Sequence, residues 1–150
     1  MSVERNKEIG RLWFEEMWSR PDFDLAYQLI HPDFKPDYIG IPKQGSELVI
    51  HEIKYFRSAF HDLRYSVEDL IADETKVWVR YTAKMRHGGS AWGFEPSNKE
   101  TGVDGMAILE IDQDGKVINQ WGAFCLVDIL VDLELVPPFW ELCKYFPKKE

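Results

Sequence analysis

The stretch Lys116-Val-Ile-Asn-Gln-Trp-Gly-Ala-Phe-Cys125 is the last strand-like run of the chain and follows the turn Asp112-Gln-Asp-Gly115. Successive side chains of a strand point to opposite faces. The members of one face are therefore expected to be Val117, Asn119, Trp121, Ala123 and Cys125. In a small α+β barrel, a cavity-lining strand of this kind is where a catalytic acid would be held. This row ends in a thiol instead, and Asp128 falls on the opposite face of an unbroken strand.

Three more extended segments precede this run. They are residues 64–72, 76–87 and 101–111, and the last strand is expected over 116–127. Before them, apolar residues recur at helical spacing over residues 2–18, 23–30 and 46–60, with Ser2 as the cap of the first helix. Helices first and antiparallel strands afterwards is the α+β order. We expect one domain over residues 1–150.

Composition excludes several classes of partner. The formal net charge of −8 argues against nucleic acid and anionic membranes, which attract clustered Lys and Arg. No apolar run reaches the ~18 residues that a membrane-spanning helix needs. The cysteines, Cys125 and Cys143, are far from CxxC spacing, and the N-terminus lacks a signal-peptide pattern. We therefore expect a cytoplasmic protein.

Two residues are candidates for proton transfer. His87 ends the second strand, and histidine is the residue type most often used for proton transfer. The alternative is a rim histidine bonded to the following loop. Asp104 lies inside the third strand, where burial would raise its pKa and make it a usable base. The alternative for Asp104 is an aspartate at a sheet edge or a dimer face, paired with a cation such as Arg80 or Lys84.

Cys125 could act as a nucleophile if a base such as His87 lay beside it, although a buried cysteine usually behaves as a small apolar residue. Asp128 could serve as a base if a bulge turned it inward. No histidine pair has ligand spacing with a carboxylate, so we expect no metal site.

Aromatic residues form 14% of the chain, and several together could line a pocket for a flat, apolar ligand. The expected lining residues are Trp13, Met17, Phe34, Phe60, Tyr81, Trp92, Phe94 and Trp121. The alternative is that these rings only fill the core.

Pieces of sequence spread over almost the whole chain carry a family resemblance. They are Asn6-Lys7 with Glu16-Met-Trp18; His31-Pro-Asp-Phe34; Arg57-Ser-Ala-Phe-His-Asp-Leu-Arg64; Val67-Glu-Asp-Leu-Ile-Ala72 with Val77-Trp-Val-Arg80; His87-Gly-Gly89 with Gly93 and Pro96; and Asp114-Gly-Lys116 to Trp121. In this order the pieces resemble the SnoaL-like polyketide cyclases of the nuclear transport factor 2-like and ketosteroid isomerase-like superfamily.

The resemblance implies a cone-shaped α+β barrel, with N-terminal helices packed on a curved, mainly antiparallel sheet. It also implies a homodimer and a reaction without metal or organic cofactor. In the cyclases, an Asp four residues after the Trp of the last strand is the general base, and Cys125 occupies that position here. Two functions stay open: a cyclase or isomerase that acts on a small, apolar carbonyl or polycyclic ligand, or a binding or dimerisation domain that has lost its base.

Overall fold

The first helical segment of the chain begins as expected and then changes its winding. The computed structural model describes residues 2–36, 42–90 and 93–144. Helix α1 spans Val3–Arg11, and the Ser2 hydroxyl accepts a hydrogen bond from the Arg5 amide, which confirms the predicted cap. It continues as a π-helix, η1, over Leu12–Trp18. The wider turn of a π-helix shifts the residues that follow around the axis, and such turns are frequent at functional sites.

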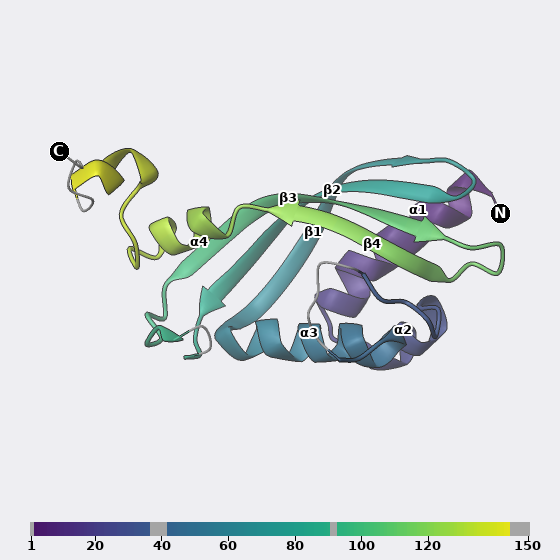
Figure 1. The fold of residues 1–150 in the computed structure, drawn as a ribbon, viewed down its shortest axis with the longest axis horizontal. Helices are drawn as coiled ribbons and strands as arrows, with labels where there is room; N and C mark the ends of the chain where they lie inside the picture. Colours follow the sequence, from purple (N-terminus) through teal and green to yellow (C-terminus); the bar gives the residue numbers. More distant parts are fainter. Residues whose placement is uncertain (1, 37–41, 91–92, 145–150) are drawn as a thin grey trace.

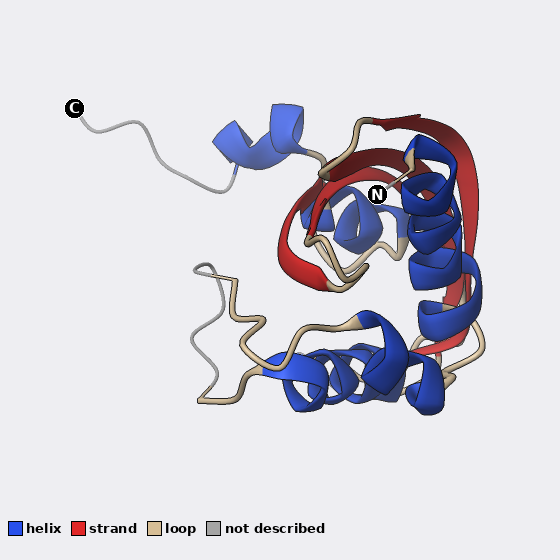
Figure 2. Ribbon diagram, turned by 90° about the vertical axis from the view of Figure 1, so that its right-hand side faces the viewer, coloured by secondary structure: helices blue, strands red, loops and turns tan. Residues whose placement is uncertain are grey.

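Two more helices precede the sheet. Helix α2 spans Phe23–Leu29, and its cap Asp22 accepts a hydrogen bond from the Leu25 amide. Helix α3 spans Gly45–Ala59 and leads directly into the first strand. All three helices lie on the concave side of the curved sheet (Figures 1 and 2).

The sheet consists of four antiparallel strands in the order β1-β2-β3-β4. Their bounds are Phe60–Ala72 for β1, Lys76–His87 for β2, Glu100–Ile111 for β3 and Val117–Phe124 for β4. Register shifts interrupt the β1–β2 ladder at two places and the β3–β4 ladder at one. Such bulges bend and twist a sheet, and here the sheet curves around the helices. The expected α+β cone arrangement is confirmed.

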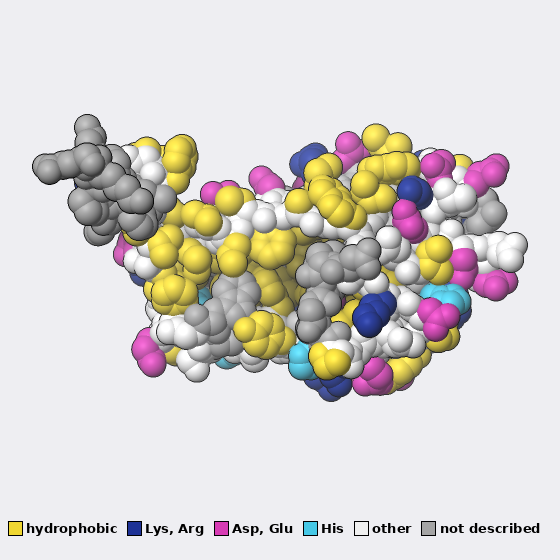
Figure 3. All heavy atoms as spheres, in the orientation of Figure 1, with side chains coloured by type: hydrophobic (Ala, Val, Ile, Leu, Met, Phe, Trp, Pro, Cys, Tyr) yellow, Lys and Arg dark blue, Asp and Glu magenta, His cyan; other side chains and the backbone are white. Residues whose placement is uncertain are grey.

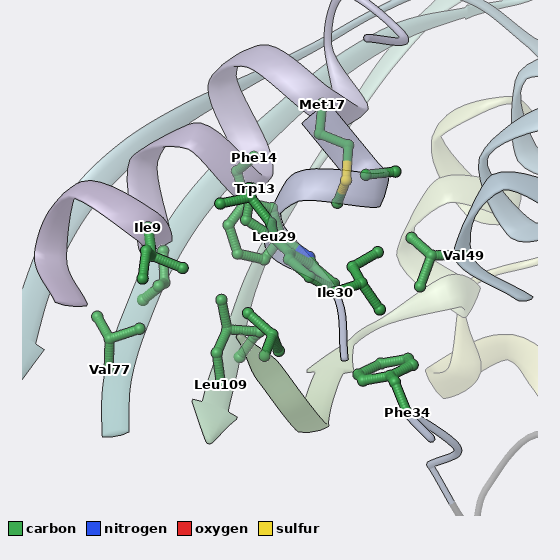
Figure 4. Packing of buried hydrophobic residues seen from close by; sticks show 14 of the residues in the cluster. Ile9, Trp13, Phe14, Met17, Leu29, Ile30, Phe34, Val49, Val77 and Leu109 are labelled. Atoms are coloured by element: carbon green, nitrogen blue, oxygen red, sulfur yellow. The ribbon is translucent and has the colours of Figure 1, made fainter. Parts of the chain in front are cut away.

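The largest apolar cluster lies between the first helices and the concave face of the sheet. Side chains from α1 and η1 meet those of α2, α3, β2 and β3 (Figure 4). Trp13 is fully buried there, with its ring centroid 6.0 Å from that of Phe34. A second cluster joins Phe60, Met85 and Val103 to Ile129 and Leu133. Ile129 and Leu133 come from the C-terminal part of the chain, where helix α4 spans Leu126–Asp132.

The expected face of the last strand is wrong. Val117 pairs with Ile111, whereas Asn119 pairs with Glu110, so that Ile118 is an extra residue in the ladder. Because side chains alternate with period two, this bulge turns the rest of the strand over. Trp121 pairs with Ile108 on the outer face, where it is 52% exposed.

The strand also ends earlier than expected. Cys125 leaves the sheet as the residue that caps α4, and a last helical turn, η3, follows over Phe139–Lys144. The chain projects away from the sheet after α4 (Figure 1). None of the described helices is long and apolar enough to cross a bilayer.

Candidate active site

A cavity of about 290 Å³ lies between the helices and the concave face of the sheet. Its lining residues are Phe14 and Trp18 of η1, Glu52, Tyr55 and Phe56 of α3, Tyr65 of β1, Tyr81 of β2, Gln120, Gly122 and Phe124 of β4, and Leu126 of α4. Figure 3 shows hydrophobic side chains gathered around a hollow between β4 and α3. The volume is close to the lower end of the usual range for small-molecule sites.

Glu52 supplies the one carboxyl group among the described residues that line this cavity. Loss of solvent around the side chain raises its pKa from 4.5 to about 7, because burial disfavours the charged form. A carboxyl group with this pKa exchanges a proton readily near neutral pH, as a general base or acid must. Glu52 therefore has the raised pKa that was expected of Asp104 from the sequence.

Two tyrosine hydroxyls accompany this carboxyl group in the cavity wall. Burial raises the pKa of Tyr81 to about 12, and burial together with the neighbouring Tyr81 raises the pKa of Tyr65. Both phenols thus stay protonated at neutral pH and can donate a hydrogen bond to a ligand oxygen. Their rings meet edge to face with centroids 5.1 Å apart, and Phe14 stacks on Tyr81 at 4.7 Å.

Trp18 adds a third potential donor. Its indole Nε1 is buried, and no hydrogen-bond partner for it exists among the described residues. Buried donors normally have a partner, so an orphan at a cavity wall suits a ligand acceptor. The Trp18 ring packs edge to face against Phe56 and Tyr65.

The end of η1 is tied to its surroundings by hydrogen bonds. The buried Ser19 hydroxyl donates to the Phe14 carbonyl at 2.8 Å and accepts from the Tyr65 amide at 2.8 Å. Arg57 of α3 donates through Nη1 to the carbonyls of Trp18 at 3.1 Å and Leu63 at 3.2 Å. Burial, and then the nearby charge of Arg64, lowers the Arg57 pKa. These bonds fix η1 relative to β1 and α3, and so fix the rings of the wall.

The structure does not bring the four predicted catalytic residues together at this cavity. His87 is buried at the end of β2, where its Nδ1 lies 3.2 Å from the Ser97 hydroxyl and accepts from the Ser97 amide at 3.2 Å. This is the alternative expected for it, a rim histidine bonded to the following loop. Asp104 is exposed on the outer face of the sheet and accepts from the Thr82 hydroxyl at 2.9 Å, not from a cation.

Cys125 and Asp128 are both exposed to solvent, and neither lines this cavity. Asp128 lies in the first turn of α4, so the bulge that occurs in β4 does not turn it inward. The His87 ring is hydrogen-bonded to Ser97, and a role for Cys125 as a nucleophile stays a prediction. Among the described residues, no three His, Cys, Asp or Glu side chains are grouped as a metal site would require.

Of the eight predicted lining residues, Tyr81 lies in the cavity wall. Four others are buried in the apolar core, which was the alternative expected for them: Trp13, Met17, Phe34 and Phe60. Phe94 is partly buried in the loop before β3 and is not part of the wall. Trp121 lies on the outer face, and Trp92 falls outside the described residues.

The sequence did contain a signal for the residue that was missed. Glu52 stands four positions after Leu48 and four before Phe56, so it continues the apolar stripe of α3. An acidic residue on the buried stripe of a helix is an exception that indicates a site. The inward row of β4, including Gln120 and Phe124, could not be found in this way because the bulge reverses it.

Comparisons with known proteins agree with this architecture. The family model described as SnoaL-like polyketide cyclase matches residues 9–133. TsrD from Streptomyces laurentii has a similar structure, with a TM-score of 0.81 and 18% identity over 91% of this chain and 99% of that one. AclR from Streptomyces galilaeus, a candidate hydroxylase, has a TM-score of 0.75 and 23% identity over 91% of this chain and 100% of that one.

A candidate polyketide cyclase, IdmH from Streptomyces antibioticus, has a TM-score of 0.73 and 17% identity over 87% of this chain and 99% of that one. At these identities the three likenesses concern the fold. The chain has no match among the curated proteins.

Proposed function

The chain belongs to the SnoaL-like polyketide cyclase family, and from this membership we propose that it is a cofactor-independent cyclase or isomerase. The substrate would be a small, largely apolar carbonyl or polycyclic compound held in the cavity of β4 and α3. The observation that carries the proposal is Glu52, a carboxyl group with a pKa of about 7 in an aromatic wall.

In the proposed reaction, Glu52 takes a proton from a carbon next to a carbonyl group. The C–H bond breaks, its electron pair forms an enolate, and the carboxylate becomes the neutral acid. The Tyr65 and Tyr81 hydroxyls and the Trp18 indole N–H are the available donors to the enolate oxygen, as in other sites that stabilise developing negative charge. A cyclase would then join the enolate carbon to a second carbonyl carbon, whose oxygen takes the electron pair of the broken π bond and the proton held by Glu52. An isomerase would return that proton to another carbon.

Glu52 would thus take the role that the family resemblance assigns to the position of Cys125. A thiol at the exposed end of β4 offers no carboxylate for that role. Helix α3 brings its own carboxyl group to the cavity from the side that faces the sheet. The cavity would therefore keep a carboxylate base, but this base would come from α3 instead of β4.

The proposal is tested by hydrogen exchange at carbon. We expect the protein to exchange the α-protons of a panel of β-dicarbonyl compounds with deuterated water, at a rate that rises as pH passes through about 7. Glu52→Gln should lower this rate by about 100-fold or more, since general bases contribute roughly 10²–10⁴. Glu74→Gln, a matched change at an exposed turn, should leave it unchanged.

Retention of full exchange in Glu52→Gln would contradict the proposal. Loss of exchange in folded His87→Ala or Asp104→Asn would instead return the chemistry to the residues predicted from sequence. A binding domain without turnover is the second candidate, and Cys125 at the position of the family base favours it. That reading predicts no exchange by the wild type and a gain of exchange in Cys125→Asp.

We also propose that the protein is a homodimer that uses the outer face of the sheet. Four residues directly opposite one another across the strands form an apolar row: Ile71, Trp78, Ile108 and Trp121. Ile71 is 65% exposed and Trp121 is 52% exposed, and an exposed apolar patch of this kind is typical of an interface. Sedimentation should show dimers at micromolar concentration and monomers for Trp121→Glu. A monomeric wild type would refute the proposal.

A further inference from the structure

Half of strand β3 has a neighbour on one side only. Residues Thr101–Gly105 pair with β2, but the β3–β4 ladder begins at Gly105, opposite Phe124. Beyond that point the chain leaves the sheet for α4 (Figure 1), and no described strand continues the ladder along residues 100–104. Backbone N–H and C=O groups on the open side of such an edge are a template for another strand.

A groove of about 780 Å³ lies over the ends of β1, β2 and β3, and α4 bounds it on the side of this open edge. Gly102 and Asp104 line it from the strand, and Asp128 and Asp132 line it from the helix. Thr101, only 7% exposed, also lines the groove, and its hydroxyl has no hydrogen-bond partner among the described residues. A buried polar group without a partner at the wall of a groove is expected to gain one from whatever fills the groove.

Charge indicates which kind of strand fits here. Glu100 and Asp104 are four residues apart and share the outer face of β3. Arg86, the cross-strand neighbour of Glu100, is held by Asp62 at 3.0 Å. The other two cations that line the groove, Arg64 and Lys84, lie on β1 and β2, away from the open side of β3.

A second copy of the chain would fit this edge poorly. Antiparallel pairing of two copies centred on Gly102 would place Glu100 of one copy opposite Asp104 of the other. Like charges directly opposite each other destabilise a strand pair, whereas opposite charges contribute about 0.2–1 kcal/mol. The open edge therefore favours a foreign strand that carries cations at two positions four residues apart.

We propose that the open edge of β3, on the α4 side of this groove, binds an extended polypeptide segment, which adds as a strand to residues 100–104 and sets basic side chains against Glu100 and Asp104. Main-chain hydrogen bonds would give the affinity, and the two carboxylates would give the specificity, as in other cases of strand addition. The carboxylates of Asp128 and Asp132 on the helix side favour the same cations. The site lies on another part of the molecule from the Glu52 cavity, so its failure would leave the proposed activity untouched.

The test uses the full chain and blocked nine-residue peptides of valine and threonine. One peptide carries two lysines four positions apart, and its control carries two glutamates there. We expect the lysine peptide to bind and to slow amide hydrogen exchange at residues 100–104, and the glutamate peptide to do neither. Equal binding of both peptides, or binding without protection of these amides, would overturn the proposal.

Charge reversal gives a second, independent readout. The double variant Glu100→Lys with Asp104→Lys should bind the lysine peptide at least about tenfold more weakly and should gain affinity for the glutamate peptide. Glu74→Lys with Asp114→Lys makes the same change of charge at exposed turns and should bind like the wild type. Protection of residues 100–104 that appears with rising protein concentration alone would show that a second copy occupies the edge, and would refute the proposal.

Discussion

The buried carboxyl group of Glu52 should make the stability of the protein depend on pH in a defined window. Its pKa is raised from 4.5 to about 7 in the folded chain by burial. Between these values the unfolded chain has lost the proton while the folded chain still holds it. The folded state then binds more protons, so stability falls as pH rises from about 4.5 to 7 and is constant above.

The size of this effect follows from the same values. A change from 4.5 to about 7 corresponds to roughly 3 kcal/mol, and partial exposure of the side chain reduces this to about 2 kcal/mol. Glu52→Gln removes the ionisation and keeps the size of the side chain. We therefore expect the variant to be more stable than the wild type by about 2 kcal/mol at pH 8, and equal to it at pH 4.

Urea unfolding at intervals between pH 4 and 8 measures this difference directly. The quantity to plot is the free energy of unfolding of Glu52→Gln minus that of the wild type, with Glu74→Gln as the matched substitution at an exposed position. A rise confined to the window between the two pKa values is the expected result. A difference that is the same at pH 4 and at pH 8 would refute the desolvation of Glu52.

Two further predictions concern the packing of the cavity wall. In Gly105→Ala the new Cβ would lie 2.4 Å from the Tyr81 hydroxyl, so the ring must move, and we expect a loss of about 1–3 kcal/mol in urea unfolding, whereas Gly122→Ala, with no atom nearer than 3.5 Å, should be tolerated. Equal stability of the two variants would contradict this. Ser19→Ala leaves a buried amide and a buried carbonyl without their partner and should cost about 1–3 kcal/mol, whereas Ser58→Ala, at an exposed site, should cost less than 1 kcal/mol. A neutral Ser19→Ala would mean that these two backbone groups find another partner.

Much of the architecture could be predicted from the sequence because it rests on periodicity. The apolar stripe of α3 and the alternation along β2 each follow from one local pattern, and both elements lie within a residue of where they were expected. The π-helical winding of η1 and the start of β1 at Phe60 depend on tertiary contacts, such as the bonds of Ser19. No local pattern encodes those contacts.

The site was less predictable for a different reason. It is assembled from side chains of six elements, and its chemistry depends on how much solvent each of them keeps. Asp104 and Glu52 are both acidic residues with apolar neighbours in the sequence. In the structure, however, Asp104 is exposed on the outer face of the sheet and Glu52 lines the cavity. Which of the two is desolvated is decided by the sheet curvature and by the position of α3, and neither is written in the neighbouring residues.

The extra residue in β4 also bears on how such a cavity can change over generations. Because Ile118 has no partner in the ladder, its loss would join Val117 directly to Asn119, and these two residues already pair with adjacent residues of β3. The bulge would close, and Gln120 and Phe124 would keep their places in the cavity wall. A single-codon deletion at this point would thus leave the ligand-facing surface of the strand unchanged. The length of this strand can therefore vary while the side chains that meet a ligand stay in place.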